Sequence, residues 1–268
     1  SLFASYIEVI GTRRGLGVTE ALRDIQINIA GPKTFIGLLV GGSIALLFSG
    51  LAIKAVGRTA GRVVQEVRRQ FRLHPGIMTG NEKPDYAAVV DICTRDSLRE
   101  LATPALLAVL SPLIIGFALG EYAMGAFLGA AILTGQLMAV MLATSGAAWD
   151  NAKKYIEDGH LGGKGSESHK AAVIGDTVGD PFKDTAGPAI NPLIKVINLV
   201  AVLALPAIIS SAGNKPLRVT IVLVCIGVLG AAIAFSKRKS ESLLEEEGTQ
   251  RETAKEPSIE QARAGSGN

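Results

Sequence analysis

The stretch TFIGLLVGGSIALLFSGLAI, residues 34–53, contains no Asp, Glu, Lys or Arg. A helix of about 20 apolar residues is long enough to cross the hydrocarbon core of a bilayer. The whole chain is 48% apolar and only 19% charged, with a mean hydropathy of +0.35, so it is too apolar for an ordinary soluble domain. We therefore predict an all-α, polytopic transmembrane helix bundle with about five full spans. The expected spans are 34–57, 101–120, 122–149, 185–211 and 219–236.

The distribution of basic residues between these runs predicts the orientation of the chain. Connections rich in Lys and Arg stay in the cytoplasm. The segments 58–100, a helix extension with a loop, and 150–184 are both rich in Lys and Arg, and basic residues directly follow the last apolar run. We place both segments and the polar tail 237–268 in the cytoplasm. Residues 1–33 are then the end of an upstream helix and an external loop, although they also carry basic residues.

Charge and cysteine content exclude several classes of protein. The 27 Lys and Arg exceed the 24 Asp and Glu by only three, and 5% of the residues are aromatic, which argues against a nucleic-acid partner. The two cysteines, Cys93 and Cys225, lie far apart and predict neither a disulfide framework nor a cysteine metal site.

Three aspartates cluster where the second predicted cytoplasmic segment enters a span. Asp176, Asp180 and Asp184 are spaced by four residues, so on a helix they form one drifting stripe. Such a row requires cations, and hard carboxylate oxygens favour Mg²⁺ over zinc or copper. The plain alternative is a pair of solvated helix ends whose charges offset the helix dipole.

Three lysines, Lys153, Lys154 and Lys183, are expected at the same surface. Ammonium groups beside carboxylate-bound Mg²⁺ suit a multiply charged phosphate. The sequence therefore favours a phosphate ester or anhydride as the substrate.

Lys195 lies inside an otherwise apolar run. It lies on the same helix face as Asp184 and about 16 Å deeper, with Asn191 between them. Proline residues are expected to kink this helix. A charge within the bilayer is costly unless it is paired or functional, although a lysine near a helix end can also extend to the interface. We expect a functional lysine whose acidic partner lies on another helix.

Two stretches resemble the C-terminal part of membrane-bound, ion-pumping pyrophosphatases. They are GAAWDNAKKYIE, residues 146–157, and GKGSESHKAAVIGDTVGDPFKDTAGPAINPLIK, residues 163–195. The resemblance extends over roughly residues 33–210. It implies a 16-helix bundle, usually dimeric, that hydrolyses cytoplasmic Mg²⁺-pyrophosphate and moves H⁺ or Na⁺ outward. This chain would hold only the last third and would be inactive without the preceding helices.

The resemblance also implies roles for individual residues. Asp150 and Asp180 would bind Mg²⁺, and Lys153 and Lys183 would hold pyrophosphate. Asp184 would position and deprotonate the attacking water.

Further residues would assist these or form the transport path. Asp176 would support catalysis and the metal, and Asn151 and Lys154 would support substrate binding. Lys195 would be the lysine of the ion gate, with Asn191 above it. The helix at 219–236 would be an addition found in some bacterial members.

Two other classes of function remain open on the sequence alone. A secondary transporter would use Lys195 and the aspartates to bind a transported ion without hydrolysis. A membrane scaffold would leave the charged surface without a purpose.

Overall fold

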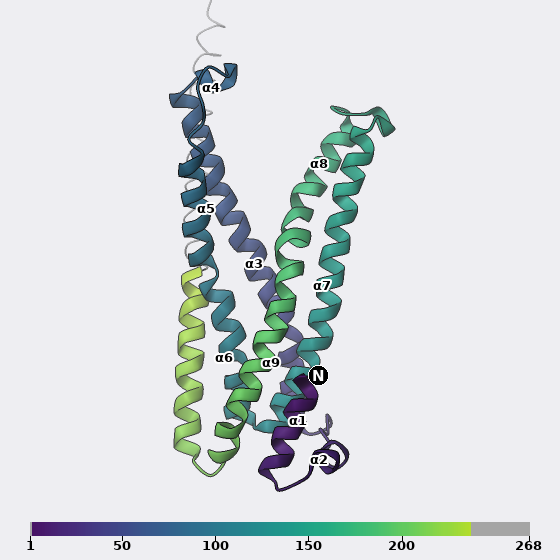
Figure 1. Cartoon of the computed structure of the whole chain (residues 1–268), viewed down its shortest axis with the longest axis vertical. Helices are drawn as coiled ribbons and strands as arrows, with labels where there is room; N and C mark the ends of the chain where they lie inside the picture. Colours follow the sequence, from purple (N-terminus) through teal and green to yellow (C-terminus); the bar gives the residue numbers. More distant parts are fainter. Residues whose placement is uncertain (1, 237–268) are drawn as a thin grey trace, which may run out of the picture.

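The computed structural model describes residues 2–236, with side chains from residue 4, and these residues are helical throughout apart from short connections (Figure 1). Five helices are long and apolar enough to cross a membrane, which confirms the predicted fold class. The predicted polar tail, 237–268, lies outside the described residues.

The helices follow one another along the chain in a simple order. Two short helices, α1 (Leu2–Arg13) and α2 (Val18–Asp24), precede the 42-residue helix α3 (Pro32–Leu73). The short α4 (Gly76–Thr79) leads into α5 (Tyr86–Glu100) and α6 (Ala102–Leu119). The 37-residue helix α7 (Glu121–Glu157) is followed by the 3-10 turn η1 (His160–Gly162). The chain then returns through α8 (Glu167–Asp180), the π-helix η2 (Pro181–Ala186) and α9 (Gly187–Ser210), and a last helix covers Lys215–Ser236.

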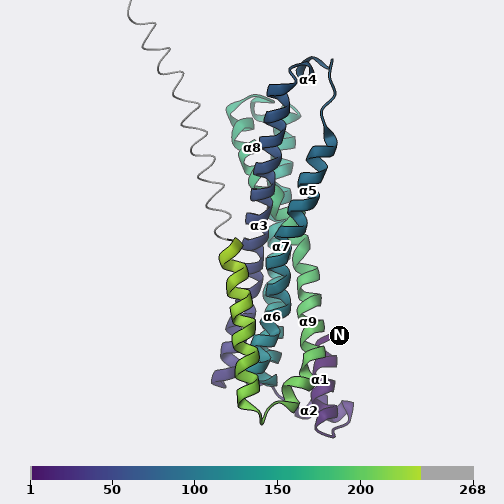
Figure 2. The same ribbon diagram turned by 90° about the vertical axis from the view of Figure 1, so that its left-hand side faces the viewer.

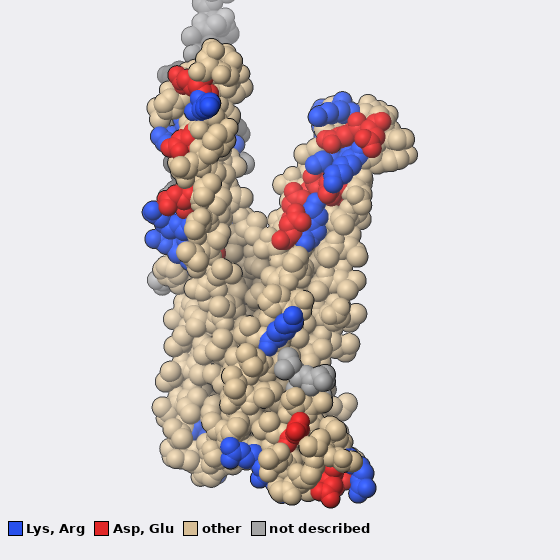
Figure 3. All heavy atoms as spheres, viewed as in Figure 1, with Lys and Arg blue, Asp and Glu red and all other residues tan. Residues whose placement is uncertain are grey.

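The helices extend from a common apolar base into two arms (Figures 1 and 2). One arm consists of the far half of α3 with α4 and α5, and the other of the far half of α7 with α8. A space-filling view shows an open notch between them, with charged side chains on the arms and at the opposite end of the molecule (Figure 3). Within the apolar region, Leu133 and Leu203 are 65% and 70% exposed, as expected for a helix surface that faces lipid or further helices.

The base is held together by a tight contact between α3 and α7. Gly37 and Gly41 stand one helical turn apart on α3, and a Cβ atom at either position would overlap the backbone carbonyl group of Ala123 or Phe127 on α7. Small residues at this spacing allow two membrane helices to approach closely. Phe127 itself is fully buried in the core beside them.

The helix that carries most of the predicted site differs from the expected one. The segments α8, η2 and α9 follow one another as one continuous helix from Glu167 to Ser210, and the kinks expected at its prolines stay a prediction. Pro181, which cannot donate a backbone hydrogen bond, lies at the first position of the π-helix. The wider turn of η2 alters the angular register between Asp180 and Asp184 that a regular α-helix would give.

Candidate active site

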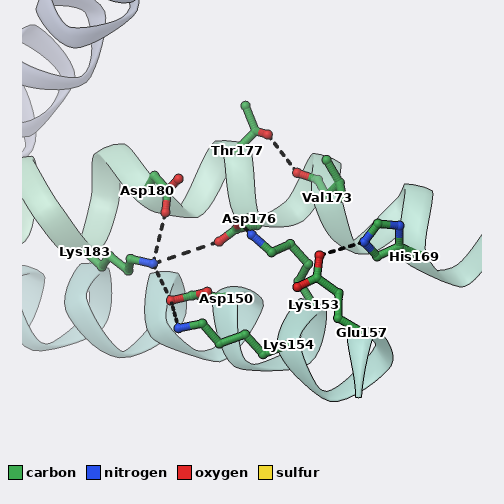
Figure 4. A network of polar contacts seen from close by, with 10 residues as sticks. All are labelled: Asp150, Lys153, Lys154, Glu157, His169, Val173, Asp176, Thr177, Asp180 and Lys183. Atoms are coloured by element: carbon green, nitrogen blue, oxygen red, sulfur yellow. Dashed lines mark hydrogen bonds and ion pairs between the residues drawn. The ribbon is translucent and has the colours of Figure 1, made fainter. Parts of the chain in front are cut away.

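The candidate site is the surface where the charged end of α7 meets α8 and η2. These elements run antiparallel because η1 reverses the chain between them (Figures 1 and 4). The close approach requires glycine, since a Cβ at Gly146 would lie 2.5 Å from the carbonyl oxygen of Gly179 and 2.8 Å from the Cβ of Lys183. Gly146 stands one turn before Asp150, so this contact sets the spacing of the charged side chains.

Six predicted site residues form one polar network, which we call the Asp-Lys cluster. Its members are Asp150, Lys153 and Lys154 of α7, Asp176 and Asp180 of α8, and Lys183 of η2 (Figure 4).

Lys183 lies at the centre of the Asp-Lys cluster. Its Nζ is 2.6 Å from Asp150 Oδ2 and 3.0 Å from Asp180 Oδ1. Lys154 Nζ also donates to Asp150 Oδ2, at 2.9 Å, but its side chain is 62% exposed. The structure therefore brings Lys183 against carboxylates from two helices, whereas Lys154 stays at the solvent edge.

Asp176 is the buried carboxylate of the cluster, with 7% of its surface exposed. Lys153 Nζ donates to its Oδ2. The other oxygen, Oδ1, accepts no hydrogen bond from residues 2–236 and lies 3.9 Å from Lys183 Nζ. Burial with one unsatisfied oxygen does not fit a solvated helix end.

The ion pairs shift the pKa values of these groups, which lie on the charged parts of the helices beyond the apolar runs. Hydrogen bonds from Lys183 and Lys154 lower the pKa of Asp150 to about 2. The hydrogen bonds to Asp150 and Asp180 raise the pKa of Lys183, and the hydrogen bond to Asp176 raises that of Lys153. The ion pairs therefore favour the charged forms of Asp150, Lys183 and Lys153.

Four predicted site residues make no side-chain hydrogen bond or ion pair with the described part of the chain. These four residues, all of them exposed, are Asn151, Asp184, Asn191 and Lys195. Lys195 thus has no acidic partner among residues 4–236, and the expected partner on another helix stays a prediction.

Sequence reasoning missed two contacts that support the cluster. His169 Nε2 lies 2.9 Å from Glu157 Oε1 and ties the start of α8 to the end of α7. The ring centroids of Trp149 and Phe182 lie 5.9 Å apart, and Trp149 also packs beside Gly179. The paired glycines at 146 and 179, each next to a charged motif, were the available signal for this close packing.

The residues present fit a magnesium site in part. Carboxylate oxygens are the ligands that Mg²⁺ prefers, and Asp176 Oδ1 is an acceptor without a donor. Among residues 4–236, however, no three His, Cys, Asp or Glu side chains lie close enough together to hold a metal ion. Such a site would need further ligands from outside the described residues.

The long apolar helices define a multi-pass membrane protein that carries a cluster of carboxylates and lysines at one surface. Residues 1–204 match the family described as inorganic H⁺ pyrophosphatase, and the chain belongs to this family. The match begins at residue 1, earlier than the resemblance in the sequence indicated.

Three relatives carry the name K(+)-insensitive pyrophosphate-energized proton pump. The chain is 55% identical over 262 residues to the protein of Streptomyces avermitilis, a match that covers 94% of this chain and 33% of that one. It is 57% identical over 256 residues to the Streptomyces coelicolor protein, covering 92% and 32%. The identity to the Chloroflexus aurantiacus protein is 51% over 249 residues, covering 91% and 32%.

These matches also locate the chain within the family. It spans about a third of the length of the curated relatives it matches. The match to the Streptomyces avermitilis protein leaves only about 16 of the 268 residues outside it, too few to exclude the 22-residue helix Lys215–Ser236. This relative therefore has a counterpart of the last helix, which lies beyond the residues that match the family as a whole.

Proposed function

We propose that this chain is the C-terminal part of a K⁺-insensitive proton pump that is driven by pyrophosphate hydrolysis. The Asp-Lys cluster carries the proposal, because it joins carboxylates and lysines from two helices at one surface of a membrane bundle. The names of the relatives favour H⁺ over Na⁺ as the transported ion and favour independence from K⁺.

The residues of this chain divide the work of binding between them. Lys183 and Lys153 neutralise the charge of pyrophosphate, with Asn151 and Lys154 at the edge of the site. Mg²⁺ bound by Asp150, Asp180 and Asp176 would supply positive charge that orients pyrophosphate and stabilises the departing phosphate. In the structure these carboxylates are paired with lysines. The binding of Mg²⁺ and pyrophosphate must therefore replace ion pairs within the cluster.

Asp184 is the proposed general base. It lies one residue beyond Lys183 on η2, is exposed, and makes no polar side-chain contact with the described part of the chain. In this proposal Asp184 accepts a proton from the attacking water, with Asp176 supporting the same site. The oxygen of that water bonds to one phosphorus atom, and the bond from this phosphorus to the bridging oxygen breaks, which releases two phosphates.

Transport requires a path below the site, and α9 offers one. Lys195 lies about 16 Å along the same continuous helix from Asp184, with Asn191 between them. Moving one charge against about 100 mV costs about 2.3 kcal/mol, which hydrolysis of an anhydride can supply if the two events are coupled. We propose that Lys195 gates the ion and pairs with a carboxylate from the upstream part of the protein.

The proposal also covers the orientation, the oligomeric state and the activity of the isolated chain. The arms, the segments 58–100 and 150–184 and the tail face the cytoplasm, and protons move outward. The pump acts as a homodimer in the cell membrane, and this chain alone is inactive because upstream helices complete the site.

The test uses the full-length protein in sealed vesicles. We expect phosphate release from pyrophosphate that requires Mg²⁺, together with acidification of the compartment opposite the arms. Asp184→Asn abolishes both, whereas Asp158→Asn, which changes an exposed aspartate just beyond α7, retains them. Solute exchange without phosphate release would instead support a secondary transporter.

A further inference from the structure

A second charged surface lies on the other arm, away from the Asp-Lys cluster (Figure 3). It borders a cavity of about 540 Å³ between α3 and α5. Six arginines line this cavity, and we call it the arginine pocket. They are Arg62, Arg68, Arg69, Arg72, Arg95 and Arg99.

Acidic side chains in the pocket neutralise only half of these arginines. Three ion pairs form, namely Arg69 with Glu66 at 2.7 Å, Arg95 with Asp91 at 2.9 Å, and Arg62 with Asp96 at 2.6 Å.

The other three arginines, Arg68, Arg72 and Arg99, have exposed side chains and no ion-pair partner among residues 4–236. The pocket therefore carries a net charge of +3, from six arginines and three carboxylates. Salt bridges within the arm explain its paired arginines but not these three.

The pocket begins near the end of an apolar run and extends away from it. Arg99 lies two residues before Leu101, where an apolar run begins, and is therefore close to the depth of lipid headgroups. Along α3 the pocket extends from Arg62 to Arg72, about 13 to 28 Å beyond Ile53, the end of the first apolar run. Below it, Arg58 pairs with Glu100 and donates a hydrogen bond to Ser236 of the last helix.

The chemistry of the lining points to phosphate. Guanidinium groups bind phosphate oxygens through two parallel hydrogen bonds and lose little rotamer freedom in doing so. Basic clusters at the cytoplasmic end of membrane helices bind anionic headgroups for the same reason. A cavity of about 540 Å³ exceeds what a monatomic anion needs and suits a multiply charged phosphate group.

We infer that the arginine pocket binds a phosphate-bearing anion at a site separate from the Asp-Lys cluster. Either the headgroup of an anionic lipid or a soluble polyphosphate supplies this chemistry. The lipid would enter from the Arg99 end, and the soluble anion from the end near Arg72.

The experiment compares binding to the full-length protein and to a triple variant, Arg68→Gln with Arg72→Gln and Arg99→Gln. A control removes three charges at the opposite end of the molecule, through Arg13→Gln, Arg23→Gln and Lys33→Gln, all of which are exposed. The first assay measures how much phosphatidylglycerol the protein retains from nanodiscs that also contain phosphatidylcholine. The other measures tripolyphosphate binding by calorimetry in pure phosphatidylcholine nanodiscs, where the difference between parent and variant isolates the pocket.

We expect the affinity of the triple variant for one of the two probes to be lower by a factor of about ten or more, because charge-assisted hydrogen bonds are lost. The assay in which this loss occurs identifies the source of the phosphate. Hydrolysis of pyrophosphate should stay within about twofold of the parent rate, which also shows that the variant is folded. If the triple variant fails to fold, Arg68→Gln alone, at an exposed position, should still weaken binding measurably.

Unchanged binding in both assays, or an equal loss of binding in the control variant, would overturn the inference. Unchanged binding in Arg68→Gln, where the triple variant does not fold, would do the same.

Discussion

Gly146→Ala tests whether the close approach of α7 to α8 sets the geometry of the Asp-Lys cluster. The added Cβ would lie 2.5 Å from the carbonyl oxygen of Gly179, whereas ordinary contacts begin at 3.4 Å, so the helices must separate locally by about 0.9 Å. The obstacle is backbone, which cannot rotate away as a flexible side chain can. Asp150, one turn along α7, would move relative to Lys183, which the same Cβ also contacts.

A displacement of about 1 Å at a catalytic site can lower the rate by about 100-fold. We therefore expect Gly146→Ala in the full-length protein to reduce kcat for Mg²⁺-dependent phosphate release by about this factor. The assay is phosphate release at saturating Mg²⁺-pyrophosphate, with the thermal midpoint as a check of folding. Gly129→Ala is the matched control, because it lies on the same helix and its Cβ meets no atom of the described chain within 4 Å. If Gly146→Ala keeps the parent kcat, the argument that this contact positions the cluster is wrong.

Three further predictions concern transport, stability and pH. Lys195→Ala should uncouple or abolish proton movement in vesicles, because the gate loses its charge, and unchanged coupled transport would remove Lys195 from the path. Gly41→Ala should lower the free energy of unfolding by about 1–3 kcal/mol, since its Cβ would overlap the backbone of α7, and Gly50→Ala, at an open position, should leave the thermal midpoint unchanged. The pKa of Asp150, about 2 in the folded protein, lies below the ordinary value of about 3.9, so its ion pairs stabilise the protein above pH 4 and are lost towards pH 2. Thermal midpoints between pH 6 and 3 should therefore fall less in Asp150→Asn than in the parent, and equal slopes would contradict this.

The apolar runs were sufficient to predict the helices that can span a membrane. A run without charges, such as residues 34–53, has few stable alternatives in a bilayer, because its backbone groups must bond within the helix. The same reasoning could not locate helix ends, since α3 continues to Leu73 through charged residues that an apolar run does not include.

The structure brings six of the predicted site residues together, but their arrangement could not be predicted from the sequence. The spacing of the aspartates suggested one stripe, yet Asp176 is buried and Asp184 is exposed within the π-helix η2. A propensity argument cannot anticipate such a turn, which depends on how Pro181 and the neighbouring helix pack. Pairings across helices, such as Asp150 with Lys183, follow from the Gly146 contact and have no local signature.

The most direct test of the account is an experimental structure of the full-length protein with Mg²⁺ and imidodiphosphate, a non-hydrolysable pyrophosphate analogue. We predict that Lys183 leaves Asp150 and Asp180 to contact the analogue, and that these carboxylates bind Mg²⁺ instead. An analogue bound elsewhere, with the ion pairs of Lys183 intact, would contradict the proposal that this cluster is the catalytic surface.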